Sequence, residues 1–222
     1  MGIVAIAMDG PVASGKTAVG RLVAQMLGCR FLDTGIMYRA ITWAAIETGV
    51  NVNDAAGLVR LAELQDMDVV FKRSGEASIR INGQDATPYL WQRDVEQNVS
   101  VVSSIAGVRN VLVVLQRGIA SKESVVMVGR DIGTVVLPDA ALKVFLTASA
   151  TERAHRRYAE LQTLGLNVPY EQVLTDLEQR DQLDSERVVA PLRMAHDAIV
   201  ITTDDLSVNE VAAQILEKVD WL

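Results

Sequence analysis

The sequence predicts an α/β fold in which a five-stranded parallel sheet is flanked by helices. Short runs of consecutive apolar residues, such as 3–8 and 125–128, are typical of parallel strands that are covered on both faces. Segments with apolar residues at helical spacing follow these runs, as in β-α-β units. The chain has 222 residues, enough to bury one sizeable core but short for two full α/β domains. We therefore expect a single domain over residues 1–222.

Predicted strands and helices alternate along most of the chain. Strands of the parallel sheet are predicted at residues 3–8, 31–33, 125–128, 142–146 and 198–201. Helices are predicted at residues 16–27, 36–48, 54–64, 94–104, 107–120, 151–164, 169–183 and 207–219. Asp54 has the residue type and position of an N-cap, and Ser207 with Glu210 matches a capping box.

This alternation is interrupted after the third predicted helix. Residues 69–72 and 78–81 have strand character and are separated by the turn-forming segment 73–76, which predicts a small antiparallel hairpin. Asn82-Gly83 predicts another turn directly after it. We therefore expect an inserted subdomain at about residues 36–109 rather than a continuation of the parallel sheet.

A glycine-rich loop connects the first predicted strand to the first predicted helix. It matches the pattern G-x-x-x-x-G-K-[ST] with Gly10, Pro11, Val12, Ala13, Ser14, Gly15, Lys16 and Thr17. Its two glycines let backbone N–H groups turn inward as an anion-binding nest, beside the positive end of the helix dipole. Lys16 can then reach the β and γ phosphates of a nucleoside triphosphate, and the Thr17 hydroxyl can bind the accompanying Mg²⁺. The strand-loop-helix context indicates a P-loop NTPase fold.

Composition and charge limit the partners that we expect. The formal net charge of −7 disfavours a broad nucleic-acid or anionic-membrane surface, because both partners require a positive field. Cys29 is the only cysteine, which excludes an internal disulfide and predicts a small buried thiol. A strand begins within three residues of the start, and no apolar run approaches the length of a membrane span. We expect a cytoplasmic monomer that acts on small molecules, without nucleic-acid or membrane partners.

Arginines recur near predicted strand and helix ends, where ligands bind in doubly wound sheets. These groups are Tyr38-Arg39, Arg109, Arg130-Asp131 and Arg180 with Asp184 and Arg187. Several arginines near a phosphate loop suggest a kinase, because phosphoryl transfer depends on positioning two phosphates and neutralising their charge. The alternative is that arginines pair with Asp and Glu on solvated helix faces, which suits Arg60, Arg93 and Arg117.

Four segments together resemble bacterial cytidylate kinases, and the resemblance covers essentially the whole chain. They are residues 33–39 (DTGIMYR), 129–138 (GRDIGTVVLP), 152–157 (ERAHRR) and 190–192 (APL). The resemblance implies transfer of the γ-phosphate of ATP to CMP or dCMP in the presence of Mg²⁺. It also implies that the inserted subdomain binds the monophosphate and that a short helical lid lies at about residues 151–168.

The resemblance implies roles for individual residues, matched by their place in these motifs. The catalytic residues would be Lys16, Arg130, Asp131 and Arg157. The loop from Gly10 to Thr17 would bind ATP together with Arg153 and Arg157, and Thr17 would hold the metal. The acceptor would be bound by Thr34, Tyr38, Arg39, Ser100, Arg109, Arg130, Asp131, Arg180, Asp184 and Arg187. Among the lid residues, Glu152 and Arg156 also fit an ordinary i,i+4 surface pair.

Within the acceptor set, the resemblance places Arg39, Arg130 and Arg187 on the substrate phosphate and Arg180 with Asp184 on the ribose. It places Ser100, Arg109 and Asp131 on cytosine. Base chemistry agrees, because cytosine presents an N4 donor beside the N3 and O2 acceptors, which a carboxylate, an arginine and a hydroxyl can match. Uracil presents an acceptor in place of that donor and would leave a buried carboxylate unpaired.

The chain departs from the family pattern at three places. Val128 stands where the family usually has Asp or Glu, which removes a carboxylate from the magnesium shell and leaves Asp9 as a replacement. Leu90-Trp91 stands where Ile-Arg is usual, and Leu183 stands where some members have another lid arginine. Two alternatives stay open: a kinase for another small acceptor, which the cytosine-reading set disfavours, and a relative that binds CMP and ATP without turnover. A GTPase would need Asn-Lys-x-Asp, which is absent.

Overall fold

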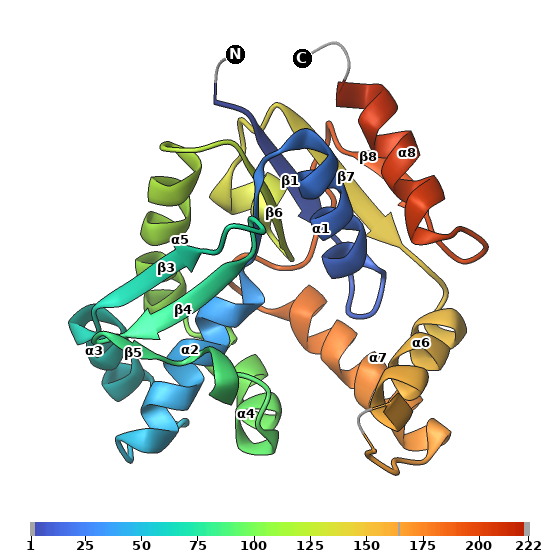
Figure 1. Ribbon diagram of the computed structural model, residues 1–222. Coiled ribbons are helices and arrows are strands. Elements are labelled where there is room, and N and C mark those ends of the chain that lie inside the picture. Colours follow the sequence, from blue (N-terminus) through green and yellow to red (C-terminus); the bar gives the residue numbers. More distant parts are fainter. Residues whose placement is uncertain (1–2, 164, 220–222) are drawn as a thin grey trace. The chain divides into compact units, whose positions relative to one another are not determined.

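A computed structural model describes residues 3–163 and 165–219 (Figure 1). The chain forms two compact units: Met1–Ala5 with Ala24–Met127, and Ile6–Val23 with Val128–Leu222. Leu164, the last residue of one predicted helix, lies outside the described residues.

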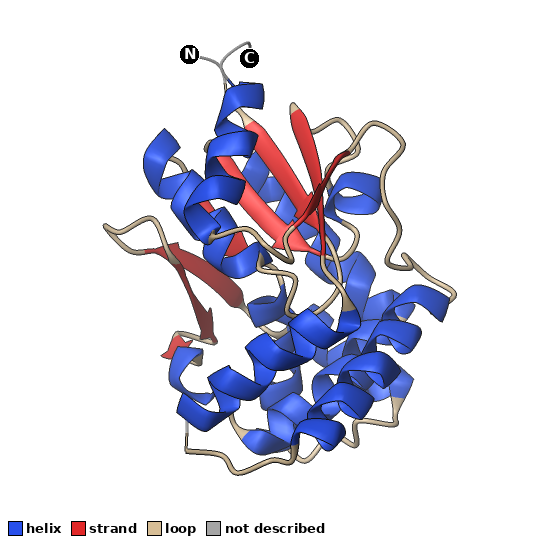
Figure 2. Cartoon of the chain, turned by 90° about the vertical axis from the view of Figure 1, so that its right-hand side faces the viewer, coloured by secondary structure: helices blue, strands red, loops and turns tan. Residues whose placement is uncertain are grey.

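The five predicted strands form one sheet, which confirms that prediction, and their order is β2-β6-β1-β7-β8. Figure 2 draws the strands in red. Their bounds are β1 Ala5–Asp9, β2 Arg30–Asp33, β6 Val125–Gly129, β7 Leu142–Thr147 and β8 Ile199–Thr202. In the parallel registers, Ile6 of β1 lies opposite Leu142 of β7, and Val144 of β7 lies opposite Ile199 of β8. Because β6 is buried along its whole length, its continuous apolar sequence fits a strand covered on both faces.

All eight predicted helices are present, with ends within a few residues of the predictions. They are α1 Lys16–Leu27, α2 Gly35–Glu47, α3 Ala55–Leu64, α4 Arg93–Ser104, α5 Ala106–Ala120, α6 Ala150–Thr163, α7 Tyr170–Glu186 and α8 Val208–Val219. Asp54 caps α3 by accepting a hydrogen bond from the Gly57 N–H at 2.9 Å. Before α8, Ser207 and Glu210 exchange the two hydrogen bonds of a capping box, so both predicted caps are confirmed.

The first unit contains the predicted hairpin. Strands β3 Met67–Phe71 and β4 Ala77–Ile81 pair antiparallel, with Met67 opposite Ile81, and a short strand β5 Gln84–Asp85 extends them to a three-stranded sheet. A 3₁₀ helix, η1 Thr87–Tyr89, then leads toward α4. Helix α2 is buried over most of its length and contacts α4, α3 and β4, so it is the central helix of this unit.

Two local features differ from the predictions. Residues after β6 form a π-helical turn, η2 Ile132–Val136, where the sequence predicts only an irregular turn. Its i→i+5 hydrogen bonds run from the Val136 N–H to the Asp131 carbonyl and from the Leu137 N–H to the Ile132 carbonyl. The Cys29 thiol, predicted to be buried, is only half-buried and free, because it lies after the end of α1 rather than on its core face.

Among the described residues, no single helix is long and apolar enough to cross a membrane, and only α4 with α5, bent by 93° at their junction, reach the length and composition together.

Candidate active site

The phosphate loop lies between the end of β1 at Asp9 and the start of α1 at Lys16. Gly10 has φ +150°, and a Cβ built there would lie 2.0 Å from the Leu146 carbonyl oxygen, so the position accepts only glycine. The Lys16 ammonium is buried and donates hydrogen bonds to the Pro11 carbonyl and to Ser14 Oγ, the latter at 3.2 Å. Thr17 is exposed in the first turn of α1.

Asp9 joins this loop to the π-helical turn. Its two carboxylate oxygens accept hydrogen bonds from the backbone N–H groups of Ile132 at 2.8 Å and Gly133 at 2.7 Å. Burial raises the pKa of Asp9 to about 6, although the two N–H donors and the charge of Lys16 act in the opposite direction. The prediction that Asp9 replaces the carboxylate missing at Val128 stays a prediction; in the structure its oxygens anchor the segment that carries Arg130 and Asp131.

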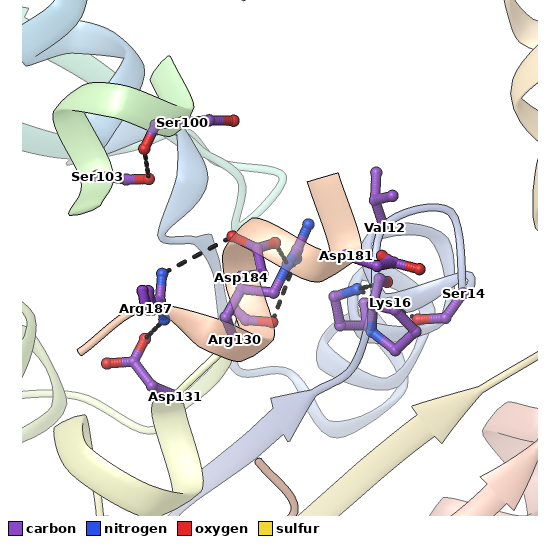
Figure 3. A network of polar contacts seen from close by, with 12 residues as sticks. Val12, Ser14, Lys16, Ser100, Ser103, Arg130, Asp131, Asp181, Asp184 and Arg187 are labelled. Atoms are coloured by element: carbon purple, nitrogen blue, oxygen red, sulfur yellow. Dashed lines mark hydrogen bonds and ion pairs between the residues drawn. The ribbon is translucent and has the colours of Figure 1, made fainter. Parts of the chain in front are cut away.

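Four predicted acceptor-site residues meet in a charged network of the second unit, at the ends of β6 and α7 (Figure 3). Arg130 Nε donates to Asp184 Oδ2 at 2.8 Å. Arg187 lies between two carboxylates, with Nη2 3.5 Å from Asp131 Oδ1 and Nη1 3.9 Å from Asp184 Oδ1. Asp131 and Asp184 are both buried, so the network holds two arginines and two carboxylates largely away from water.

The electrostatics of this network favour the ionised form of Asp184. Burial alone would raise the pKa of Asp184, but the guanidinium of Arg130, followed by those of Arg180 and Arg187, lowers it below its ordinary value. Arg180 therefore belongs to the same electrostatic group. A site with this surplus of guanidinium groups suits an anionic ligand.

The predicted lid arginines lie on α6 and make contacts within the second unit. Arg153 is buried: its Nε donates to the Ala148 carbonyl at 3.1 Å, and its Nη1 donates to Asp181 Oδ2 at 2.6 Å and to the Val12 carbonyl at 3.3 Å. Arg153 thus contacts the backbone of the phosphate loop directly. Arg157 pairs with Glu160 at 2.7 Å on the more exposed face of α6.

Arg156 forms the i,i+4 pair that sequence alone leaves as an alternative. Its Nε donates to Glu152 Oε1 at 2.9 Å, and its Nη1 donates to Thr203 Oγ1 at 2.9 Å. The Thr203 hydroxyl in turn donates to the Ser14 carbonyl at 3.3 Å. Arg156 therefore forms the surface pair with Glu152 and also connects to the phosphate loop through Thr203.

The remaining predicted acceptor residues lie in the first unit. Arg109 is buried on α5, donates to the Ser103 carbonyl at 3.0 Å, and lies over the Tyr38 ring at 5.1 Å. Ser103 Oγ donates to the Ser100 carbonyl at 3.1 Å, so Ser100 and Arg109 are linked through one turn of α4 (Figure 3). Thr34 is buried directly before α2, which carries Tyr38.

Arg39, one residue further along α2, is held by three neighbours. It is 6% exposed, and its Nη1 faces Glu96 Oε1 at 3.0 Å and the Leu90 carbonyl at 3.3 Å. Its guanidinium lies 4.1 Å from the centroid of the Trp91 ring. In the described part of the chain, its Nε and Nη2 donate no hydrogen bond to protein, which leaves two donors of the guanidinium fork available.

The described residues contain no group of three or more His, Cys, Asp or Glu side chains that could hold a metal ion. In phosphoryl-transfer sites Mg²⁺ keeps several waters and is held by substrate phosphates with one or two protein groups, and Thr17 is the residue predicted for that role.

Comparison with known proteins identifies the family. Residues 6–221 match the family described as Cytidylate kinase. A cytidylate kinase of Bacillus licheniformis is 45% identical over 215 residues, which cover 97% of this chain and 95% of that protein. The chain belongs to the cytidylate kinase family. A second cytidylate kinase, of Bacillus subtilis, is 43% identical over 215 residues and covers 97% of this chain and 96% of its own length.

The fold of this cytidylate kinase family member extends to more distant kinases. A shikimate kinase of Bacteroides thetaiotaomicron has a TM-score of 0.50 and 15% identity, and the match covers all of both chains. This similarity concerns the fold alone, and it confirms the predicted P-loop kinase architecture.

Three residues that contact predicted site residues were given no role from the sequence. Asp181 holds Arg153, Thr203 links Arg156 to the phosphate loop, and Trp91 packs on Arg39. Asp181 directly follows the predicted site residue Arg180, so its position could have indicated a role. Thr203 follows a strand and has no motif around it that could have done so. Trp91 was noticed only as a departure from the family pattern, because a sequence does not show which side chain an exposed tryptophan covers.

Proposed function

We propose that this chain transfers the γ-phosphate of ATP to CMP and dCMP, producing ADP and CDP or dCDP. The observation that carries the proposal is the network in which Arg130 and Arg187 face the buried carboxylates of Asp131 and Asp184, in a family member that also carries an intact phosphate loop. Two partly buried arginines that face carboxylates are suited to a phosphate group that enters and leaves.

The donor half of the reaction rests on the phosphate loop. The backbone N–H groups of residues 10–17 and the α1 dipole would bind the β and γ phosphates, and Lys16 would follow the transferred group. Lys16 now donates to the loop itself, so triphosphate binding would replace those hydrogen bonds. Thr17 would hold Mg²⁺, which supplies charge neutralisation on the phosphates when bound.

The α6 arginines divide into two roles under this proposal. Arg153 would shape the loop by its contact with the Val12 carbonyl, and Arg157 on the more exposed face would contact the ATP phosphates when the lid closes. We further propose that residues of about 151–168 act as the lid and residues of about 36–109 as the CMP-binding subdomain.

The acceptor half rests on arginine donors that the protein leaves available. Nε and Nη2 of Arg39 would bind the CMP phosphate, and Nη2 of Arg130, which donates no hydrogen bond among the described residues, would do the same. Arg187, held by Asp131 and Asp184, would complete the phosphate site. Arg180 and Asp184 would contact the ribose.

Base recognition rests on Ser100, Arg109 and Asp131. Arg109 and Asp131 are both buried, so a base with a mismatched edge would bring polar groups together without complementary hydrogen bonds. Cytosine offers its N4 amino group to a carboxylate, whereas uracil offers a carbonyl. We therefore expect discrimination against UMP.

The deciding experiment measures ADP formation with CMP, dCMP, UMP, AMP and GMP as separate acceptors. We expect strong turnover with CMP and dCMP and weak turnover with UMP. Equal rates with all five would refute the assignment of acceptor, and binding of CMP and ATP without turnover would favour a nucleotide sensor. In Asp131→Ala the preference for CMP over UMP should fall; unchanged discrimination would remove Asp131 from base recognition.

A further inference from the structure

Trp91 lies on a short connection that is fixed at both ends. It follows η1 Thr87–Tyr89 and precedes α4, whose N-cap is Gln92. The ring of Tyr89 stacks on Trp43 of α2 with a centroid distance of 5.3 Å and an interplanar angle of 7°. Trp43 is buried and lies one helical turn after Arg39, so the stack fixes the connection against the turn of α2 that carries Arg39.

The position of Trp91 on that connection is unusual for a large aromatic residue. The side chain is 58% exposed, yet the guanidinium of Arg39 lies over its ring at 4.1 Å. Burial of the indole in the core therefore does not explain its presence. Its defined contact in the described residues is with an arginine that is itself 6% exposed.

This contact orients Arg39 without using its hydrogen-bond donors. A guanidinium that packs its flat face on an aromatic ring keeps its N–H groups directed outward in the guanidinium plane. Glu96 and the Leu90 carbonyl both contact Nη1, which fixes the position of that nitrogen in the guanidinium group. The remaining donors, on Nε and Nη2, form the bidentate pattern that matches two oxygens of a phosphate.

We propose that Trp91 is a positioning residue that holds the Arg39 guanidinium plane for the phosphate of the acceptor nucleotide. This inference rests on the proposed function, in which Arg39 binds that phosphate. Trp91 acts through Arg39, so its contribution depends on the phosphate of the ligand and not on the nucleoside.

The test compares CMP with cytidine, which lacks the phosphate, by isothermal titration calorimetry. Trp91→Ala should weaken CMP binding about fivefold, the size expected for loss of a partly exposed arginine–aromatic contact, and leave cytidine binding unchanged. Trp91→Phe keeps a ring and should restore CMP binding to within about twofold of the original chain. In steady-state assays, Trp91→Ala should raise KM for CMP, with little change in kcat or in KM for ATP.

A matched control exists in the same unit. Phe71 also lies under an arginine, with the guanidinium of Arg30 at 5.4 Å from its ring centroid. Phe71→Ala removes the same kind of contact and should leave the affinity for both CMP and cytidine unchanged. Thermal unfolding of each variant, followed by circular dichroism, verifies that it is folded under the titration conditions.

The double variant separates this inference from the proposed function. In an Arg39→Ala background, Trp91→Ala should have no further effect on CMP binding. Equal weakening of CMP and cytidine by Trp91→Ala, or no weakening of either, would overturn the positioning role. If Arg39→Ala binds CMP as tightly as the original chain, the role of Arg39 in the proposed function fails, and the role of Trp91 fails with it.

Discussion

The Asp9 carboxylate offers a sharp prediction, because one buried group connects the phosphate loop to the Arg130-Asp131 segment. It is 4% exposed and accepts hydrogen bonds from Ile132 and Gly133. Burial raises its pKa from 3.8 to about 6. A carboxyl group whose pKa is higher in the folded than in the unfolded protein stabilises the fold most when it is protonated. Its contribution is complete below about pH 3.8 and is lost as pH rises through about 6.

The magnitude follows from the size of the shift. A rise from 3.8 to about 6 corresponds to about 3 kcal/mol of unfolding free energy between the two limits. Other carboxylates also titrate toward the acidic end of this pH range, so the contribution of Asp9 can be measured separately only in the upper part of the range. Between pH 7 and pH 5, the contribution of Asp9 should rise by about 1 kcal/mol.

The assay is urea unfolding of the original chain and of Asp9→Asn at several values between pH 5 and pH 7.5. Asparagine has nearly the same shape and does not titrate in this range. The unfolding free energy of the original chain minus that of the variant should increase as pH falls from 7 to 5, by about 1 kcal/mol. A difference that is independent of pH, or that decreases as pH falls, would refute the account of Asp9 as a buried, desolvated carboxylate.

Two further predictions concern the backbone. Gly10→Ala should lower the free energy of unfolding by at least about 2 kcal/mol, because the new Cβ would meet the Leu146 carbonyl. In the control Gly118→Ala, the new Cβ meets nothing within 4 Å, so this change should be neutral or stabilising. Equal effects of the two substitutions would contradict the steric argument. Asp54→Ala should cost about 1 kcal/mol in urea unfolding, because it removes the cap on the Gly57 N–H, and a loss below about 0.3 kcal/mol would show that solvent replaces this cap fully.

The fold was predictable because its elements carry strong local signals. Helix α1 begins and ends at the predicted residues, since Lys16 closes the phosphate loop and Gly28 follows the last apolar position. Strand β6 is apolar along its whole length, and the hairpin β3–β4 lies between clear turn residues. The π-helical turn Ile132–Val136 was not predictable from local sequence, and the carboxylate that accepts from its first two N–H groups, Asp9, is more than 120 residues away in sequence.

The residue types of the candidate site were predictable, whereas their partners were not. The motif around Arg130 and the pair Asp184 and Arg187 could be recognised, and the structure brings these groups together through Asp131. Which carboxylate contacts which arginine depends on contacts between residues far apart in sequence, such as Arg130 with Asp184. The same holds for Arg153, whose contacts with Asp181 and the Val12 carbonyl could not be predicted and whose role on the ATP phosphates stays a prediction.

The glutamate–arginine pair on α6 shows why spacing alone does not decide between two interpretations. Glu152 and Arg156 do form the ordinary i,i+4 pair. The same guanidinium also reaches Thr203, which contacts the phosphate loop. Sequence spacing predicts the local contact, and only the fold reveals the distant one.

The central claim is phosphoryl transfer between ATP and CMP, and its most direct measurement follows the γ-phosphate itself. The protein is incubated with Mg²⁺, CMP and ATP that carries a label in the γ-phosphate, and the products are separated. We predict that the label appears in CDP, and that Lys16→Ala slows its appearance mainly through kcat. Label that appears only in inorganic phosphate, or that stays in ATP while both nucleotides bind, would contradict the account.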